Sequence, residues 1–271
     1  MFLAPTLQVR WLRLLMVEIV IGDVHARTDA LRRLLRAVGA LDERGRRTRG
    51  CWVVQIGDLL DRHATDRANL ATARLAASAV DVVLAGNHEL RMLSEPAGGG
   101  RAALASLAAS GWPHAAFALG DWLVTHAGVH PLLARGLPAP AMECAAEIND
   151  RWHRRGPRHL LDPLFDWRGP ARGGDAPCGG IFWAHAAEWK GVGKAPKRMG
   201  KAPWGQITGH VPQPEPRLLP GRRWAIDLGA RGGRLAALVR PSSESRWHPV
   251  VVQSGEERDA VDATTRKRLV A

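Results

Sequence analysis

The chain lacks the sequence features that are typical of secreted and membrane proteins. Its 271 residues include no tyrosine and only three cysteines, Cys51, Cys144 and Cys178, which are far apart and form no CxxC pair. This usage excludes a disulfide framework and argues against a thiolate metal site, and it predicts a reducing, cytoplasmic setting. No stretch reaches the roughly 18 apolar residues of a membrane span, so no membrane partner is expected. Residues 1–16 are expected to be a poorly ordered lead-in rather than a signal peptide.

Lysine is also scarce, although the chain is strongly basic. The formal net charge is +12, yet only five of the 38 basic residues are lysines. A charge of this size attracts polyanions, so a nucleic-acid partner is one interpretation. We favour biased residue usage instead, because arginine, alanine and glycine are abundant. Four of the lysines lie in 190–201, expected to be a solvated loop, with a cationic lid over the site as the alternative.

Short apolar runs separated by helical patterns predict an α/β fold. The expected strands are 17–21, 52–56, 82–85, 121–125 and 206–208. Helical spacing or alanine-rich sequence follows at 28–38, 64–79, after residue 100 and at 141–155. Residues 156–180 are expected to be irregular, and 224–227 with 235–239 to form a final hairpin. The domain is therefore expected to span 17–240, followed by a polar tail over 241–271.

Five short segments place Asp, Asn or His directly after these strands. They are Gly22–His25 (GDVH), Gly57–Arg62 (GDLLDR), Gly86–Glu89 (GNHE), Thr125–Gly128 (THAG) and Thr208–His210 (TGH). A single Gly-Asp is usually a turn, and a single His is usually a satisfied polar residue. Loops at the carboxyl ends of strands in an α/β sheet, however, form its binding site. Five such segments in one local context therefore predict a metal centre.

The candidate ligands are three imidazoles, two carboxylates and one amide: Asp23, His25, Asp58, Asn87, His126 and His210. This mixed set suits Mn²⁺, with Fe or Zn²⁺ as alternatives, better than Mg²⁺ or Ca²⁺. Asp58 lies between the two ligand groups along the chain and is the expected bridging ligand. Two divalent ions would lower the pKa of a bridging water, and the resulting hydroxide would attack phosphorus in line.

Three further motif residues suit the hydrolysis of a phosphoric ester. His88 can protonate a leaving alkoxide, and Asp61 can hold the orientation and tautomer of the His88 imidazole. The planar fork of Arg62 can bind a phosphate oxygen. The residues alone therefore predict a phosphoester hydrolase that uses two metal ions.

The five motifs resemble those of the metallophosphoesterase (calcineurin-like) superfamily, in particular its phosphoprotein-phosphatase-like bacterial branch. The resemblance covers about residues 17–240 and implies a four-layer αββα sandwich, in which two mixed β-sheets are flanked by helices. It implies that Asp23, His25 and Asp58 hold one metal, and that Asp58 with the last three ligands holds the other. It also implies the same acid dyad, with Arg62 and Asn87 as phosphate contacts.

The chain departs from the family pattern at several positions. Ala26 and His63 stand where the family has glycine; a positive φ would cost Ala26 about 1 kcal/mol, and histidine tolerates it better. Neither is a ligand, so activity is expected to survive. The family's second phosphate-binding arginine corresponds to either Arg168 or Arg172. The segment Phe182–His185 resembles an aromatic family segment but lacks its arginine.

The expected activity is that of a binuclear-metal phosphomonoesterase, with a phosphoserine or phosphothreonine protein as one candidate substrate. The alternative is a symmetrical dinucleoside polyphosphate (diadenosine tetraphosphate) hydrolase, and a nucleotide is a further phosphorylated substrate to consider. A nuclease fits less well, because Glu89 stands where that branch usually has aspartate. A non-catalytic phosphate-binding module would have lost a ligand or the acid, and none is missing.

Overall fold

The structure, a computed structural model, describes residues 16–94, 100–155, 162–185, 187–189, 203–241 and 246–253. Its first sheet has the strand order β10-β9-β1-β2-β3, with bounds β1 (Val17–Ile21), β2 (Cys51–Gln55), β3 (Val82–Val83), β9 (Arg234–Arg240) and β10 (His248–Gln253). The second has the order β4-β5-β6-β8-β7, with bounds β4 (Ala116–Leu119), β5 (Trp122–Thr125), β6 (Gly205–Thr208), β7 (Arg217–Leu219) and β8 (Arg223–Ala225).

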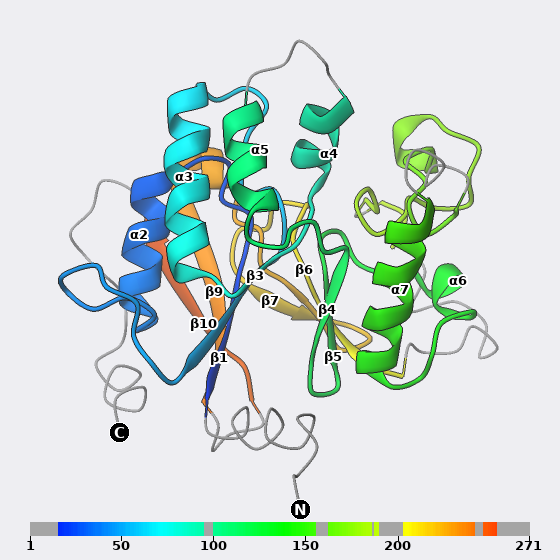
Figure 1. Cartoon of the computed structure of the whole chain (residues 1–271). Coiled ribbons are helices and arrows are strands. Elements are labelled where there is room, and N and C mark those ends of the chain that lie inside the picture. Colours follow the sequence, from blue (N-terminus) through cyan, green and yellow to red (C-terminus); the bar gives the residue numbers. More distant parts are fainter. Residues whose placement is uncertain are drawn as a thin grey trace, which may run out of the picture.

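Helices cover the outer faces of both sheets (Figure 1). The first sheet is covered by α2 (Thr28–Ala37), with α3 (Asp66–Ala79) and α5 (Arg101–Ala108) packed alongside, and α7 (Ala141–Arg155) packs on β4 and β5 of the second. Side chains alternate along β1: Ile19 and Ile21 pack with Leu31 of α2, whereas Val20 packs with Ile207 of the other sheet. These layers confirm the predicted αββα sandwich.

The parallel strands of both sheets end at the same end of the sandwich. β1, β2 and β3 run parallel in the first sheet, and β5, β6 and β8 run parallel in the second. The carboxyl ends of parallel strands lie at the same edge of a sheet. The loop after β3 leads directly into α4 (Asn87–Ser94). All five motifs are therefore collected at one end of the sandwich.

The predicted hairpin of 224–227 and 235–239 is wrong. β8 pairs with β6 and β7, whereas β9 pairs with β1 and β10 of the other sheet. A short 3₁₀ helix, Ala230–Gly232, connects them, and the left-handed glycines Gly229 and Gly233 on either side turn the chain. Apolar strands of this length fit either sheet, so the sequence pattern could not show that the chain crosses between them.

The predicted polar tail also needs correction, because His248–Gln253 forms β10 at the edge of the first sheet. Pro249 is compatible with an edge strand, where a missing N–H interrupts no central ladder. The predicted lead-in (residues 1–15 of 1–16), the lysine segment 190–201 and residues 254–271 lie outside the described residues. Within the described part, no helix is long and apolar enough to cross a bilayer.

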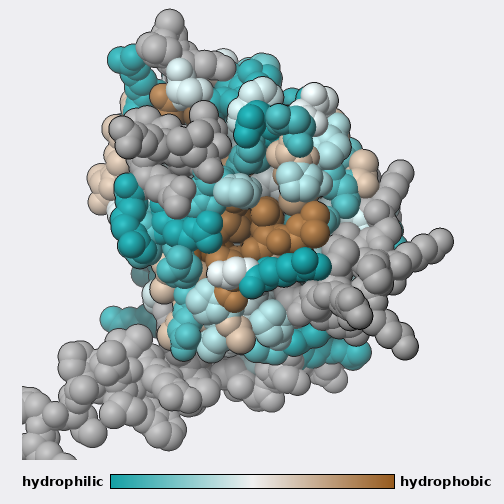
Figure 2. All heavy atoms as spheres, turned by 90° about the vertical axis from the view of Figure 1, so that its right-hand side faces the viewer, coloured by the Kyte–Doolittle hydropathy of each residue, from teal (hydrophilic) through white to brown (hydrophobic). Residues whose placement is uncertain are grey.

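Figure 2 shows the side of the molecule that carries α6 (Pro131–Ala134) and α7, with one hydrophobic area among hydrophilic side chains. Leu132 of α6 and Met142 of α7 are among the few large apolar side chains that are exposed. The other large apolar residues of the described chain are mostly buried between the layers, which leaves a rigid sandwich to hold the loops at its end.

Candidate metal centre

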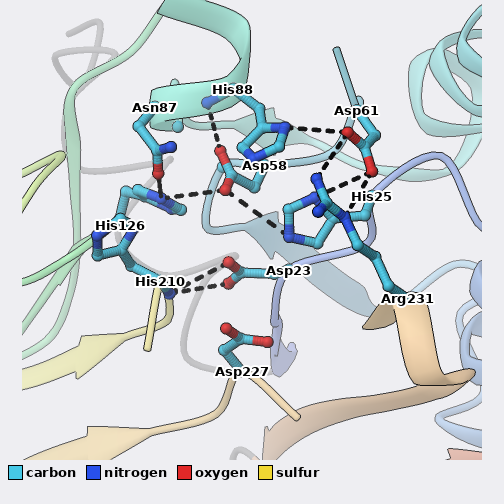
Figure 3. A network of polar contacts seen from close by, with 12 residues as sticks. Asp23, His25, Asp58, Asp61, Asn87, His88, His126, His210, Asp227 and Arg231 are labelled. Carbon is cyan, nitrogen blue, oxygen red and sulfur yellow. Dashed lines mark hydrogen bonds and ion pairs between the residues drawn. The ribbon is translucent and has the colours of Figure 1, made fainter. Parts of the chain in front are cut away.

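The structure brings all six predicted ligands to one point (Figure 3). Asp23 and His25 follow β1, Asp58 follows β2, and Asn87 is the first residue of α4. The remaining two come from the second sheet, His126 after β5 and His210 after β6. The ligands therefore approach from both sheets.

Asp58 lies at the centre of this group. Its Oδ2 atom is 3.5 Å from His126 Nε2 and 3.8 Å from His25 Nε2. Three sets of ligand atoms lie within 4.8 Å of one another: Asp23, His25 and Asp58; Asp58, His126 and His210; and His25 with the dyad residues Asp61 and His88. Asn87 Oδ1 lies 3.0 Å from His126 Nε2. The first two sets share Asp58, as a bridging ligand would require.

The backbone at these positions is strained. His25, Asp58 and His210 have φ values of 49°, 50° and 68°, a left-handed region that non-glycine residues rarely adopt. Such strain is typical of functional sites, where the surrounding structure enforces it. Ala26 has a φ of 59°, so the cost expected for a side chain there applies, whereas His63 is not among the positive-φ residues.

Two motif glycines make room for the carboxylates. A Cβ atom at Gly86 would lie 2.2 Å from Asp58 Oδ1, and one at Gly209 would lie 1.9 Å from Asp23 Oδ1. His88 N–H donates to Asp58 Oδ1 at 2.8 Å, and His210 N–H donates to Asp23 Oδ2 at 3.1 Å. The glycines let neighbouring loops approach closely enough for their amides to hold both carboxylates.

Four buried carboxylates gather here: Asp23, Asp58, Glu89 and Asp227. Within the described chain, none of them forms an ion pair with lysine or arginine. Burial, reinforced by the neighbouring carboxylates, raises the pKa of Asp23 and of Asp58 well above the usual range. Burial also raises the pKa of Glu89 to about 7 and that of Asp227 to about 6. So much uncompensated buried negative charge fits a site for cations.

The imidazoles of the centre are held neutral, which is the form that binds metals. Burial lowers the pKa of His25 and of His210 to about 3, and neighbouring His88 and Arg172 respectively add to the effect. Burial lowers the pKa of His126 well below its usual value. The His126 Nδ1 atom lies 3.2 Å from the Ile56 carbonyl oxygen, which leaves Nε2 facing Asp58. The residues present therefore fit two divalent metal ions.

The predicted acid dyad lies beside this centre. His88 Nδ1 is 3.2 Å from Asp61 Oδ1. Burial would raise the pKa of Asp61, but the His63 N–H and the guanidinium of Arg231 outweigh it and lower that pKa. Burial lowers the pKa of His88 to about 4; Asp61 opposes this, and Arg231 acts in the same direction as burial.

The three predicted phosphate-binding arginines lie in different surroundings. Arg62 is exposed and near enough to His88 to contribute to its lowered pKa. Arg172 Nη2 lies 3.4 Å from His210 Nε2, and its guanidinium lies 4.9 Å from the Trp183 ring centroid. Arg168 instead binds the Asp166 carboxylate, with Nη2 2.8 Å from Oδ2. Of the two alternatives, only Arg172 contacts a candidate ligand.

The motifs did not identify three residues of the site as functional. Glu89 was noted only as part of the GNHE motif. Its carboxylate accepts hydrogen bonds from the backbone N–H groups of Asp58, Leu60 and Gly86 and so connects two motif loops. Asp227 comes shortly after β8, just as the predicted ligands come after their strands. This position after a strand could have identified it from the sequence. Arg231 carries no local signal, because its partner Asp61 is 170 residues away.

Comparisons with known proteins agree with this architecture. No curated protein matches the chain by sequence. A solved structure of a cold-active protein tyrosine phosphatase is 18% identical over 87% of this chain and 79% of its own, with a TM-score of 0.53. A cold-active protein-tyrosine phosphatase of a psychrophilic Shewanella species is 17% identical over 87% and 80%, with a TM-score of 0.50. At such identities these likenesses show the fold alone.

The family comparison extends over most of the chain. The model of the calcineurin-like phosphoesterase family matches residues 17–229, a span that contains all five motifs. Members of this family use divalent metals in a binuclear site, and the ligand sets around Asp58 are candidates for it. The chain therefore belongs to the calcineurin-like phosphoesterase family and is a metal-dependent phosphoester hydrolase.

Proposed function

We propose that the protein is a binuclear-metal phosphomonoesterase whose metal centre is built on Asp58. The observation that carries the proposal is the sharing of Asp58 by two ligand sets inside a cluster of buried carboxylates that form no ion pair with lysine or arginine in the described chain. Asp23, His25 and Asp58 would hold one ion, and Asp58 with Asn87, His126 and His210 the other. Bound divalent ions supply Lewis acidity and an acidified water for in-line attack on phosphorus. Manganese suits this ligand set best, with iron or zinc as alternatives.

The groups around the centre have complementary roles in this proposal. Arg62 and Arg172 bind oxygens of the substrate phosphate, and the amide of Asn87 adds a contact from the ligand side. Arg168 is a weaker candidate, because Asp166 already engages its guanidinium. When the bond from phosphorus to the leaving oxygen breaks, His88 gives its proton to that oxygen. Asp61 holds the imidazole through Nδ1, which leaves Nε2 for the substrate.

The free enzyme would hold His88 mostly unprotonated at neutral pH, because its pKa is lowered to about 4. A dianionic phosphate bound between Arg62 and His88 acts in the opposite direction, since a nearby negative charge favours the protonated imidazole. Substrate binding would thus favour protonation of His88, the group that donates the proton to the leaving oxygen.

The substrate is proposed to be a phosphomonoester, with phosphoproteins as the first class to test. Two of the similar solved structures are protein tyrosine phosphatases, which supports a phosphoprotein and adds phosphotyrosine to phosphoserine and phosphothreonine. A dinucleoside polyphosphate remains the alternative. All three cysteines are free and buried, which supports action in a reducing compartment such as the cytoplasm.

Activity on an aryl phosphate tests the proposal. The full chain with Mn²⁺ should hydrolyse the ester, and EDTA should abolish turnover. Asp58→Asn and His88→Ala should each be severely impaired, and full activity in either variant would contradict the mechanism. A panel of phosphopeptide, diadenosine tetraphosphate, nucleotide and oligonucleotide then ranks the substrate classes by kcat/KM.

A further inference from the structure

Arg231, which lies outside the motifs, contacts the dyad residue Asp61 through two nitrogen atoms. Its Nε atom lies 2.8 Å from Asp61 Oδ2 and its Nη2 atom 2.9 Å from Asp61 Oδ1, so the two planar groups meet as a fork (Figure 3). Such bidentate pairs add fixed geometry to charge attraction. We propose that Arg231 is a positioning residue that fixes the orientation of Asp61, and through it the acid His88. The inference rests on the proposed function.

The surroundings of Asp61 leave it one orientation. Besides the two arginine contacts, Oδ1 accepts the His63 N–H at 2.9 Å and lies 3.2 Å from His88 Nδ1. The Asp61 side chain is only 7% exposed, whereas the Arg231 side chain that binds it is 51% exposed. Without Arg231, the carboxylate would retain His88, a single amide and the His25 ring, whose Nδ1 atom is 3.8 Å from Oδ2, and it could rotate about its side-chain bonds.

Arg231 is itself held in place by the backbone. It lies in the 3₁₀ helix Ala230–Gly232, which left-handed glycines flank on both sides. Its carbonyl oxygen accepts a hydrogen bond of 2.8 Å from Arg27 Nη2, and Arg27 follows the strained turn at His25 and Ala26. The connection between the two sheets is therefore tied to the loop that carries the first metal ligands, and it delivers the guanidinium to the dyad.

The proposal predicts a loss that depends on the leaving group. A leaving group of low pKa departs without protonation, whereas an alkoxide or phenoxide of high pKa needs a well-placed acid. Arg231→Gln should lower kcat/KM for phenyl and alkyl phosphates by about 10- to 100-fold, a part of what general acid catalysis contributes. For 2,4-dinitrophenyl phosphate the loss should stay below about threefold, because the acid contributes little there.

The variants are tested in the full chain loaded with Mn²⁺. Arg234→Gln is the matched control: Arg234 lies three residues away and donates to the Pro214 carbonyl instead of the dyad. Arg231→Lys keeps the charge without the fork and should fall between the wild type and Arg231→Gln. It also provides a second variant if Arg231→Gln does not fold. Mn²⁺ stoichiometry should be unchanged in both.

A double-variant cycle separates positioning from general damage. In a His88→Ala background, Arg231→Gln should cause no further loss, since the residue acts only through His88. Equal losses for all leaving groups, or additive losses in the cycle, would overturn the role proposed for Arg231. Neither result would contradict the proposed phosphatase function. A wild-type chain without metal-dependent hydrolysis would instead reject the proposed function.

Discussion

Two neighbouring regions of the site treat buried carboxylates in opposite ways. Asp23, Asp58, Glu89 and Asp227 have raised pKa values and no lysine or arginine partner in the described chain. Asp61, a few ångströms from His25, has a lowered pKa and a bidentate arginine. The protein thus supplies a fixed cation where a carboxylate must hold an imidazole, and supplies none where a mobile cation is to bind.

The largest expected effect comes from removing one carboxylate from each region. Asp58→Asn should lower kcat/KM about a thousandfold, equivalent to about 4 kcal/mol, because the shared ligand is lost. Asp61→Asn should cost about a hundredfold on poor leaving groups and leave Mn²⁺ binding intact. Steady-state kinetics and Mn²⁺ titration of both variants measure these effects. Loss of metal binding in Asp61→Asn would erase the distinction between the regions.

The pH dependence of stability should have opposite signs in the two regions. The folded-state pKa of Asp227 is raised from 3.8 to about 6. Relative to Asp227→Asn, the metal-free wild type should therefore lose stability as the pH rises from about 4 to 6, by up to about 3 kcal/mol.

The folded-state pKa of Asp61 is lowered instead. Relative to Asp61→Asn, the wild type should hold its advantage above pH 3.8, the ordinary pKa of aspartate, and lose it as the pH falls. Urea unfolding in EDTA across this pH range gives both differences. Parallel pH curves for the two variants would contradict the contrast.

A smaller effect is expected at Glu89, which organises the metal loops. Glu89→Gln keeps one carbonyl oxygen but turns an amide N–H₂ toward backbone donors that the carboxylate now accepts. The free energy of unfolding should fall by about 1–3 kcal/mol. Urea unfolding of the metal-free protein near pH 4 measures the change, because there a carboxyl group with its pKa raised to about 7 is protonated and its ionisation does not oppose the loss. A stability equal to that of the wild type would mean that the metal loops keep their conformation without the hydrogen bonds to Glu89.

The smallest expected effect distinguishes between Arg172 and Arg168 as the phosphate-binding residue. Arg172→Gln should raise KM for an aryl phosphate about tenfold, since one charge-assisted hydrogen bond to phosphate is worth about 1.4 kcal/mol or more. Arg168→Gln should leave KM unchanged, because Arg168 engages Asp166 and Asp175. Initial rates over a range of substrate concentrations decide between them. The reverse order would move phosphate recognition away from His210.

Local sequence was sufficient to predict which candidate ligands lie together, but not which residues contact them. Each predicted ligand follows a short apolar strand, and strand ends meet by the rules of the fold. Arg231 and Asp61 are 170 residues apart, and nothing local links them. Arg168 and Arg172 share one irregular loop, so only tertiary contacts separate them. The crossing from β8 to β9 was hidden for the same reason, since strand pairing is a long-range property.

The central claim is that the uncompensated carboxylates bind two divalent ions through Asp58. Titration of the metal-stripped chain with Mn²⁺ at pH 7.5, followed by calorimetry and by electron paramagnetic resonance, tests it most directly. We expect two ions per chain with the spectrum of a coupled pair, and loss of the coupled signal in Asp58→Asn. A wild type that binds no ion or only one, or an Asp58→Asn variant that still holds a coupled pair, would contradict the account.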